Sequence, residues 1–191
     1  IAEIKKLKEL SGVGLTDAKN ALVEADGDFD KALEAMRKKG LTKAEKRGDR
    51  ETREGVIDSY IHDGRIGAIV EVNCETSFVA KTDEFKDLAH KIAMQVASMN
   101  PLYVSAEDIP EEARAAKQKE LEANFKGPEN MKEQILAGQI KKAFADKILL
   151  DQPYILDDSK TVAEFIKDNI AKTGENISIK QFKRIELGVT E

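Results

Sequence analysis

The sequence predicts an α+β fold: an N-terminal three-helix bundle, followed by an α+β core with a three-stranded antiparallel sheet and packed helices. First, apolar residues in residues 1–40 recur at helical spacing in three short runs. Second, Asp63-Gly64 lies between two strand-like runs, and Asp-Gly is among the strongest short hairpin signals. Third, the predicted strands and helices do not alternate along the chain, which favours an antiparallel sheet over a parallel one.

Residues 1–40 are expected to form a bundle similar in size to a ubiquitin-associated module. Thr16 is the expected N-cap of the second helix, and Asp28 that of the third. Gly40 is expected just beyond the third helix, where a left-handed residue is least costly. This division makes residues 1–40 a separate unit.

A linker is predicted over residues 41–53, because this segment is charged and has no core pattern. The core is then predicted to span residues 54–191. Its strands are expected at Val56–Ile61, Ile66–Val72 and Ile177–Leu187, the last with a possible bulge.

Helices are expected between and after these strands. The longest begins near Thr82, which can cap it, and ends at Asn100-Pro101. Two more are predicted after Pro110, one to about residue 125 and one from Met131 to about residue 150. A shorter helix, Val162–Lys172, closes at Gly174.

Composition excludes several classes of protein. The 191 residues carry 31 Lys+Arg and 36 Asp+Glu, and this mixed, mildly acidic surface argues against binding nucleic acid. No run of about 18 apolar residues predicts a membrane span. The single cysteine, Cys74, cannot form an internal disulfide, and no signal peptide is recognisable, so we expect a cytoplasmic protein.

The sequence shows no catalytic constellation, and we expect neither an enzyme nor a bound metal or cofactor. Asp26–Asp30 begins like a calcium-binding loop, but Lys31 stands where that loop needs Gly, and Arg37 where it needs a bidentate acid. His62 and His90 have no partner at metal-ligand spacing. The acidic run is therefore interpreted as a turn and a helix cap.

The connector after the second strand contains an aromatic residue, Phe78, that belongs to neither the strand nor the apolar stripe of the next helix. A large ring on a short polar turn either caps the local core or is presented to another molecule. Composition alone favours the first interpretation, because scattered apolar residues near a surface are ordinary.

The segment Glu71–Lys81 closely resembles the signature of the bacterial elongation factor Ts family. Its one departure is Ser77, where the family has Asp. Leu7–Leu22 resembles a second signature of that family, with Lys8 and Ser11 as mild changes. Further similarity runs in order along the chain at residues 100–105, 150–154, 174–177 and 186–188.

This resemblance implies a guanine nucleotide exchange factor that binds elongation factor Tu in its GDP state during translation elongation. It implies no covalent chemistry. By analogy, the wedge that disturbs the partner's magnesium site is formed by Thr76, Ser77, Phe78 and Val79. The magnesium ion offsets the charge of the bound phosphates, so disturbing it weakens GDP binding.

The same resemblance implies that the N-terminal bundle docks on the GTPase domain through some of Gly12, Val13, Gly14 and Lys19. Capping and a solvated charge are the alternative roles for these four residues. An adaptor of the ubiquitin-associated or nascent-chain-binding type is the alternative function.

Longer relatives have two core copies in one chain, whereas this chain has one, so a homodimer is expected. The last predicted strand would otherwise be an exposed edge, which invites pairing with an identical chain.

Overall fold

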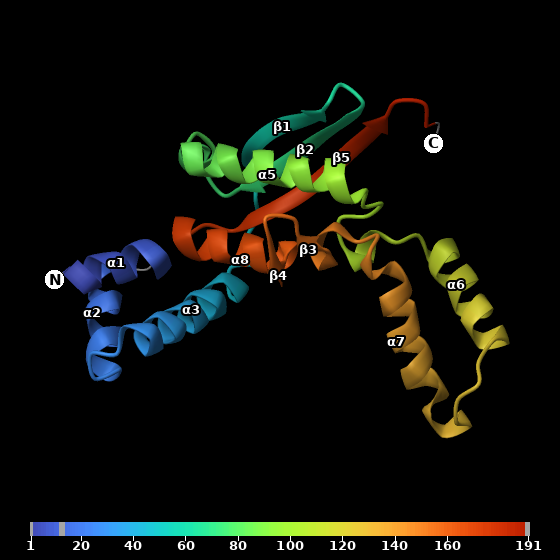
Figure 1. Ribbon diagram of the computed structural model, residues 1–191, viewed down its shortest axis with the longest axis horizontal. Coiled ribbons are helices and arrows are strands. Elements are labelled where there is room, and N and C mark those ends of the chain that lie inside the picture. The colour runs from blue at the N-terminus through green and yellow to red at the C-terminus, as the bar shows by residue number, and fades with distance from the viewer. Residues whose placement is uncertain (1, 12–13, 190–191) are drawn as a thin grey trace.

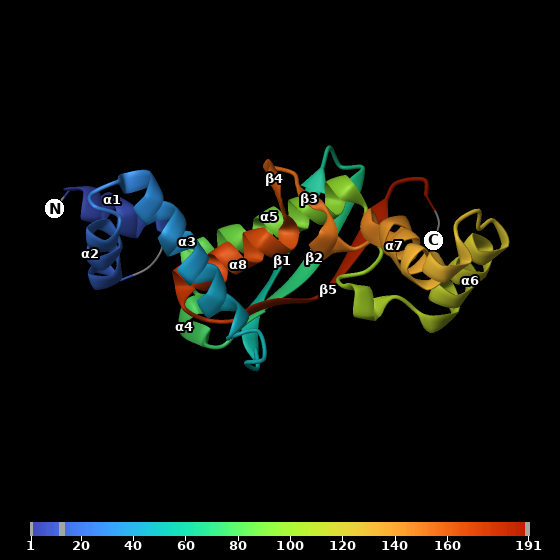
Figure 2. The same ribbon diagram turned by 90° about the horizontal axis from the view of Figure 1, so that it is seen from below.

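The computed structural model describes residues 2–11 and 14–189. Its helices are α1 (Ala2–Ser11), α2 (Leu15–Glu24), α3 (Phe29–Glu45), α4 (Ser77–Ala80), α5 (Asp83–Met99), α6 (Glu111–Ala123), α7 (Lys132–Ala145) and α8 (Val162–Thr173). Its strands are β1 (Glu54–His62), β2 (Ile66–Cys74), β3 (Pro153–Tyr154), β4 (Asp157–Thr161) and β5 (Ile177–Glu186). Short 3-10 turns lie at Ala106–Asp108, Glu129–Met131 and Leu149–Asp151. The core lies between the α1–α3 bundle at one end and the α6–α7 hairpin at the other (Figures 1 and 2).

The main sheet confirms the predicted three antiparallel strands, in the order β1-β2-β5. The β1–β2 turn has positive φ at both central residues, Asp63 (49°) and Gly64 (66°), as an Asp-Gly hairpin requires. Glu71 pairs with Gln181 and Val72 with Ile179, which leaves the intervening residue of β5 as the predicted bulge. The small β3–β4 ribbon was not predicted.

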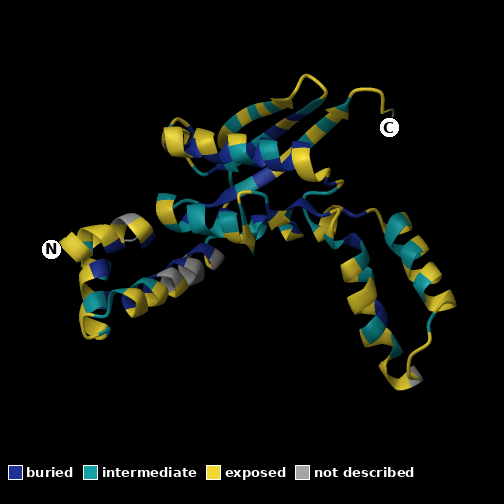
Figure 3. Cartoon of the chain, in the orientation of Figure 1, coloured by how far each residue is buried: buried dark blue, intermediate teal, exposed yellow. Residues whose placement is uncertain are grey.

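One face of the sheet is covered by helices. α5 packs on β1 and β2, and α8 packs beside it on β5, so that their apolar residues form one core. The predicted ends of α5 are confirmed, because Thr82 accepts a hydrogen bond from the backbone N–H of Phe85 and Asn100 is left-handed. Gly174 ends α8 in the same left-handed conformation. Buried residues gather where α5, α8 and the sheet meet (Figure 3).

The predicted end of the third helix at Gly40 is wrong. α3 continues to Glu45, so the first five residues of the predicted linker are helical. Gly40 is buried with its Cα against α8, and Ala44 lies in the main core. Glycine costs a helix interior about 1 kcal/mol relative to alanine, and here that cost is offset by a close approach of two helices.

Two further helix boundaries also differ from the prediction. The N-cap of α2 is Gly14 and not Thr16. The helix predicted to run from Met131 to about residue 150 ends at Ala145. Asp28, in contrast, caps α3 as predicted, because its carboxylate accepts hydrogen bonds from the backbone N–H groups of Asp30 and Lys31.

In the part of the chain that the structure describes, no helix combines the length and apolarity that crossing a bilayer requires.

Candidate functional site

The segment after β2 forms a turn that is fixed at both ends. Thr76 is extended (φ −129°, ψ 151°), and its side-chain oxygen accepts a hydrogen bond from the backbone N–H of Val79 at 3.4 Å. This bond caps the N-terminus of the one-turn helix α4. Thr82 then caps α5 and donates a hydrogen bond to the carbonyl oxygen of Val79 at 2.8 Å. Two threonine caps therefore hold a four-residue helix between strand and helix.

Phe78 projects from this turn into solvent. Its exposed fraction is 81%, whereas those of Val79 and Ala80 are 7% and 5%. The interpretation of Phe78 as a local core residue is therefore wrong, and the ring is presented outward. Val79 instead anchors α4 to the core, and Ser77 is exposed beside Phe78.

A groove of about 520 Å³ lies beside the exposed ring, between α5 and α8. Phe85 and Phe165 contribute aromatic surface to it, and Phe165 stacks on Tyr154 with the ring centroids 4.1 Å apart. Glu84 and Asp87 line it from α5, and Lys172 lines it from α8. Phe78 thus stands at the rim of an apolar groove that carries charges of both signs.

Cys74 lies directly beneath the turn and is fully buried. Its thiol donates a hydrogen bond to the carbonyl oxygen of Thr76 at 3.2 Å. Burial raises the pKa of this thiol, and the nearby carboxylate of Glu175 raises it further. The neutral thiol is therefore favoured, which suits packing and not nucleophilic chemistry. Within the described residues, no three His, Cys, Asp or Glu side chains are grouped to hold a metal ion.

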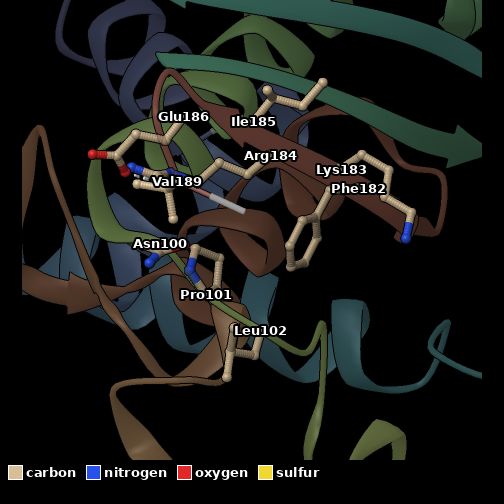
Figure 4. Close-up of a pocket in the computed structure, with 9 residues that line it drawn as sticks. All are labelled: Asn100, Pro101, Leu102, Phe182, Lys183, Arg184, Ile185, Glu186 and Val189. Carbon is tan, nitrogen blue, oxygen red and sulfur yellow. Dashed lines mark ion pairs between the residues drawn. The ribbon is translucent and has the colours of Figure 1, made fainter. Parts of the chain in front are cut away.

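Another pocket, of about 690 Å³, lies at the opposite end of the sheet (Figure 4). It is formed by Asn100–Leu102 and the C-terminal part of β5. Arg184 has a structural role there. It forms an ion pair with Glu186 at 2.8 Å and donates a hydrogen bond to the carbonyl oxygen of Ala97 at 3.0 Å. This arrangement joins β5 to the end of α5.

The residues predicted for the N-terminal contact are far from the turn in the sequence. Gly14 and Lys19 are both exposed on α2 or at its start. Gly12 and Val13 lie outside the residues that the structure describes. The bundle is connected to the core near this turn through α3, which packs along α8.

Comparison with known protein sequences identifies the family of this chain. The family model described as Elongation factor TS matches residues 34–189. The chain belongs to the elongation factor Ts family. The role of this family in translation elongation is nucleotide exchange on elongation factor Tu.

Individual relatives match nearly the whole chain. The elongation factor Ts of Thermotoga maritima is 51% identical over 187 residues, which are 97% of this chain and 94% of that protein. That of Moorella thermoacetica is 48% identical over 98% of this chain and 94% of its own length. That of Gloeothece citriformis is 53% identical over 97% of this chain but 66% of its own length, so it is longer. An adaptor function based on the bundle alone leaves most of this similarity unexplained.

Sequence reasoning singled out residues 76–79 but not the residues beside which they lie in the fold. The groove beside Phe78 combines residues of α4, α5 and α8, and α8 begins more than eighty residues later in the chain. Only the apolar stripes of these helices could have indicated that they pack together.

Proposed function

We propose that this chain releases GDP from elongation factor Tu by inserting the Phe78 ring into the partner's nucleotide domain, without covalent chemistry of its own. One observation supports this most strongly: a phenylalanine that is 81% exposed on a turn whose next two residues, Val79 and Ala80, are buried. Burying such a ring is worth about 1.5–3 kcal/mol. The turn offers this free energy only to a partner, since Val79 and Ala80 already fill the local core.

The free energy gained by burying the ring offsets the cost of distorting the partner. GDP phosphates are held by backbone amides, a lysine and a magnesium ion. Moving the helices that position the magnesium ion leaves the phosphates under-neutralised, so GDP is bound more weakly. Linkage then requires GDP to weaken the binding of this chain by the same factor. The complex with both nucleotide and exchange factor is therefore transient, as a cytoplasmic exchange cycle needs.

We assign the N-terminal bundle a second contact with the same GTPase domain, through Lys19 and the segment Gly12, Val13 and Gly14. The exposure of Gly14 at the start of α2 and of Lys19 within α2 supports this assignment. A lysine at such a contact acts as a flexible point charge toward an acidic partner surface.

We further propose that the chain works as a homodimer, with the open face of the sheet packed on the same face of a second copy. Four isoleucines on that face have large exposed fractions: Ile57 70%, Ile61 68%, Ile69 48% and Ile185 75%. The residues that alternate with them along the strands are mostly half-buried or buried, and the strand register places the isoleucines in adjacent rows.

A second copy suits this face because the face carries both signs of charge beside the isoleucines. Glu71 and Lys183 are one row apart on it. In a two-fold arrangement, Glu71 of one copy can therefore meet Lys183 of the other. β5 is the edge strand that the sequence predicted, but the apolar surface of Ile185 belongs to the face and not to the edge.

Stopped-flow kinetics with fluorescent GDP on elongation factor Tu tests the proposed function. We expect the wild-type chain to accelerate GDP release and Phe78→Ala to lose most of that acceleration while keeping its circular dichroism and melting temperature. Leu156→Ala is the matched control, because Leu156 is an apolar residue with 55% exposure away from the turn. Equal exchange rates for wild type and a folded Phe78→Ala would refute the wedge.

A further inference from the structure

The turn that ends α8 contacts the wedge turn directly. Glu175, which follows the left-handed Gly174, accepts two hydrogen bonds from Thr76. The backbone N–H of Thr76 lies 3.0 Å from Oε2, and its hydroxyl lies 2.6 Å from Oε1. Both oxygens of one carboxylate are thus engaged by one residue that lies 99 positions away in the sequence.

The residues next to Thr76 and Glu175 in the sequence also form a hydrogen bond with each other. Glu75 accepts a hydrogen bond from the backbone N–H of Asn176 at 2.6 Å, and Arg50 approaches the second oxygen of Glu75 at 3.4 Å. The buried side-chain amide of Asn176 donates to the carbonyl oxygens of Gly48, at 3.1 Å, and Arg50, at 2.7 Å. Three segments that are distant in the sequence are therefore joined, and the turn that carries Glu175 is itself fixed.

The polar groups of Thr76 are all engaged within the protein. Its N–H and hydroxyl donate to Glu175, and its carbonyl oxygen accepts from the thiol of Cys74 and from the backbone N–H of Ala80. Hydrogen bonds to a carboxylate are roughly twice as strong as neutral ones. As the N-cap, Thr76 sets the direction in which α4 leaves the strand, and Phe78 is two residues further along.

We propose that Glu175 is a positioning residue for nucleotide exchange, which holds Thr76 so that α4 presents Phe78 in the geometry that the partner receives. The inference rests on the proposed role of Phe78 as the wedge. Thr76, whose polar groups are engaged within the protein, accordingly orients the wedge. A ring presented in its final orientation loses less conformational freedom on binding, which raises the rate of productive insertion.

The test measures exchange rates for Glu175→Gln, which keeps the size of the side chain but removes its charge and one acceptor. We expect kcat/KM for GDP release to fall about tenfold, because a hydrogen bond to a charged group is lost. Glu133→Gln is the control, since Glu133 is an exposed carboxylate on α7 that lines neither the groove nor the turn that carries Phe78. Its exchange rate should equal that of the wild type.

The Phe78→Ala background separates positioning from general stability. If Glu175 acts through Phe78, then adding Glu175→Gln to Phe78→Ala should not lower exchange further, although the melting temperature should fall in both backgrounds. Thr76→Val, which lacks the hydroxyl, should be non-additive with Glu175→Gln. A further loss of similar size in the Phe78→Ala background, or wild-type exchange by Glu175→Gln, would overturn the proposal.

Amide hydrogen exchange of the free protein gives a readout that does not depend on the partner. Glu175→Gln should speed exchange at Val79 and Ala80 relative to the amides of α5. Unchanged protection at these amides would overturn the positioning role even if the chain proved to act on nucleotide exchange by another route. Faster amide exchange together with no GDP release by the wild type would instead support the role of Glu175 in holding the turn and reject only the wedge function of Phe78.

Discussion

Gly40 of α3 and Ala171 of α8 lie at the point where the N-terminal bundle meets the core. A Cβ atom built on Gly40 would stand 3.2 Å from the Cβ of Ala171, closer than ordinary van der Waals contact. The two helices can approach this closely only because one of them has no side chain there. The contact explains why α3 continues through the predicted linker, since its last turns pack on α8.

Substitution of the two helical glycines Gly40 and Gly138 should have opposite effects on stability. Gly40→Leu places a large side chain against α8 and should lower the free energy of unfolding by about 1–3 kcal/mol. Gly138→Ala in α7 has open space around the new Cβ and should raise it by about 0.5–1 kcal/mol. Urea unfolding followed by circular dichroism measures both. Equal stability of Gly40→Leu and wild type would show that the contact is not tight.

Truncation should distinguish the part of α3 that belongs to the bundle from the part that belongs to the core. A chain that begins at residue 29 keeps all of α3, whereas one that begins at residue 41 loses the Gly40 contact and leaves Ala44 in a frayed turn. We expect the second chain to melt at a clearly lower temperature than the first.

Both truncated chains should bind elongation factor Tu more weakly than the full chain, by roughly tenfold, which corresponds to about 1.4 kcal/mol. Isothermal titration with nucleotide-free elongation factor Tu measures this difference. Full-strength binding by the chain that begins at residue 29 would remove α1 and α2 from the docking contact.

Features set by neighbouring residues were predicted well from the sequence. The Asp63-Gly64 turn and the caps Thr82, Asn100 and Gly174 depend on local backbone chemistry, and the structure confirms them. The end of α3 could not be predicted in this way. A glycine after an apolar stripe usually ends a helix, and only the packing of Gly40 on Ala171 overrides that preference.

The candidate site shows the same division. Phe78 stood out from the sequence because it fits neither flanking apolar stripe, and its exposure agrees with that. Glu175 lies in one of the stretches that resemble the family, residues 174–177, but nothing in the sequence linked it to Thr76, since an acidic residue after a helix is ordinary on a protein surface. Its two hydrogen bonds to Thr76 depend on how α8 is placed against β2, which requires the tertiary structure.

Stability at high pH should depend on Tyr154. Burial raises the pKa of its phenol from 10.0 to about 12, with smaller contributions from the carboxylates of Asp87 and Asp157. Because the folded state holds the proton more tightly than the unfolded state, this contribution to stability is complete below about pH 10. It is lost as the pH rises toward 12.

Tyr154→Phe should remove this pH dependence, because phenylalanine keeps the ring that stacks on Phe165 but cannot ionise. Melting temperatures of wild type and variant, measured from pH 8 to pH 12, should differ by a constant amount up to about pH 10. Above that pH, the difference should shift by a few degrees in favour of the variant. Parallel curves over the whole range would contradict the assigned burial of the phenol.

Restoring the family's acid at position 77 should strengthen the exchange complex. Ser77 is exposed beside Phe78, and an aspartate there can accept a charge-assisted hydrogen bond from the partner. We expect Ser77→Asp to tighten binding to nucleotide-free elongation factor Tu by about 1 kcal/mol, roughly fivefold. Ser77→Asn, which has the same shape without the charge, should give a smaller change. Weaker binding by Ser77→Asp would indicate that the partner surface facing this residue has adapted to serine.

A charge on the open face of the sheet should separate the proposed dimer without unfolding the chain. Ile185 is 75% exposed at the edge strand, so Ile185→Lys costs the single chain little but buries an unpaired charge between two copies. Light scattering at micromolar concentration should give a mass near twice 21.2 kDa for the wild type and near 21.2 kDa for the variant.

Val23→Lys is the control, because Val23 is 68% exposed on α2, away from the sheet, and should leave the dimer intact. Since Cys74 is buried, reducing agents should not change the mass of either form. A wild-type mass of one chain across the concentration range would reject the dimer, and a dimeric Ile185→Lys would show that the copies associate through another surface.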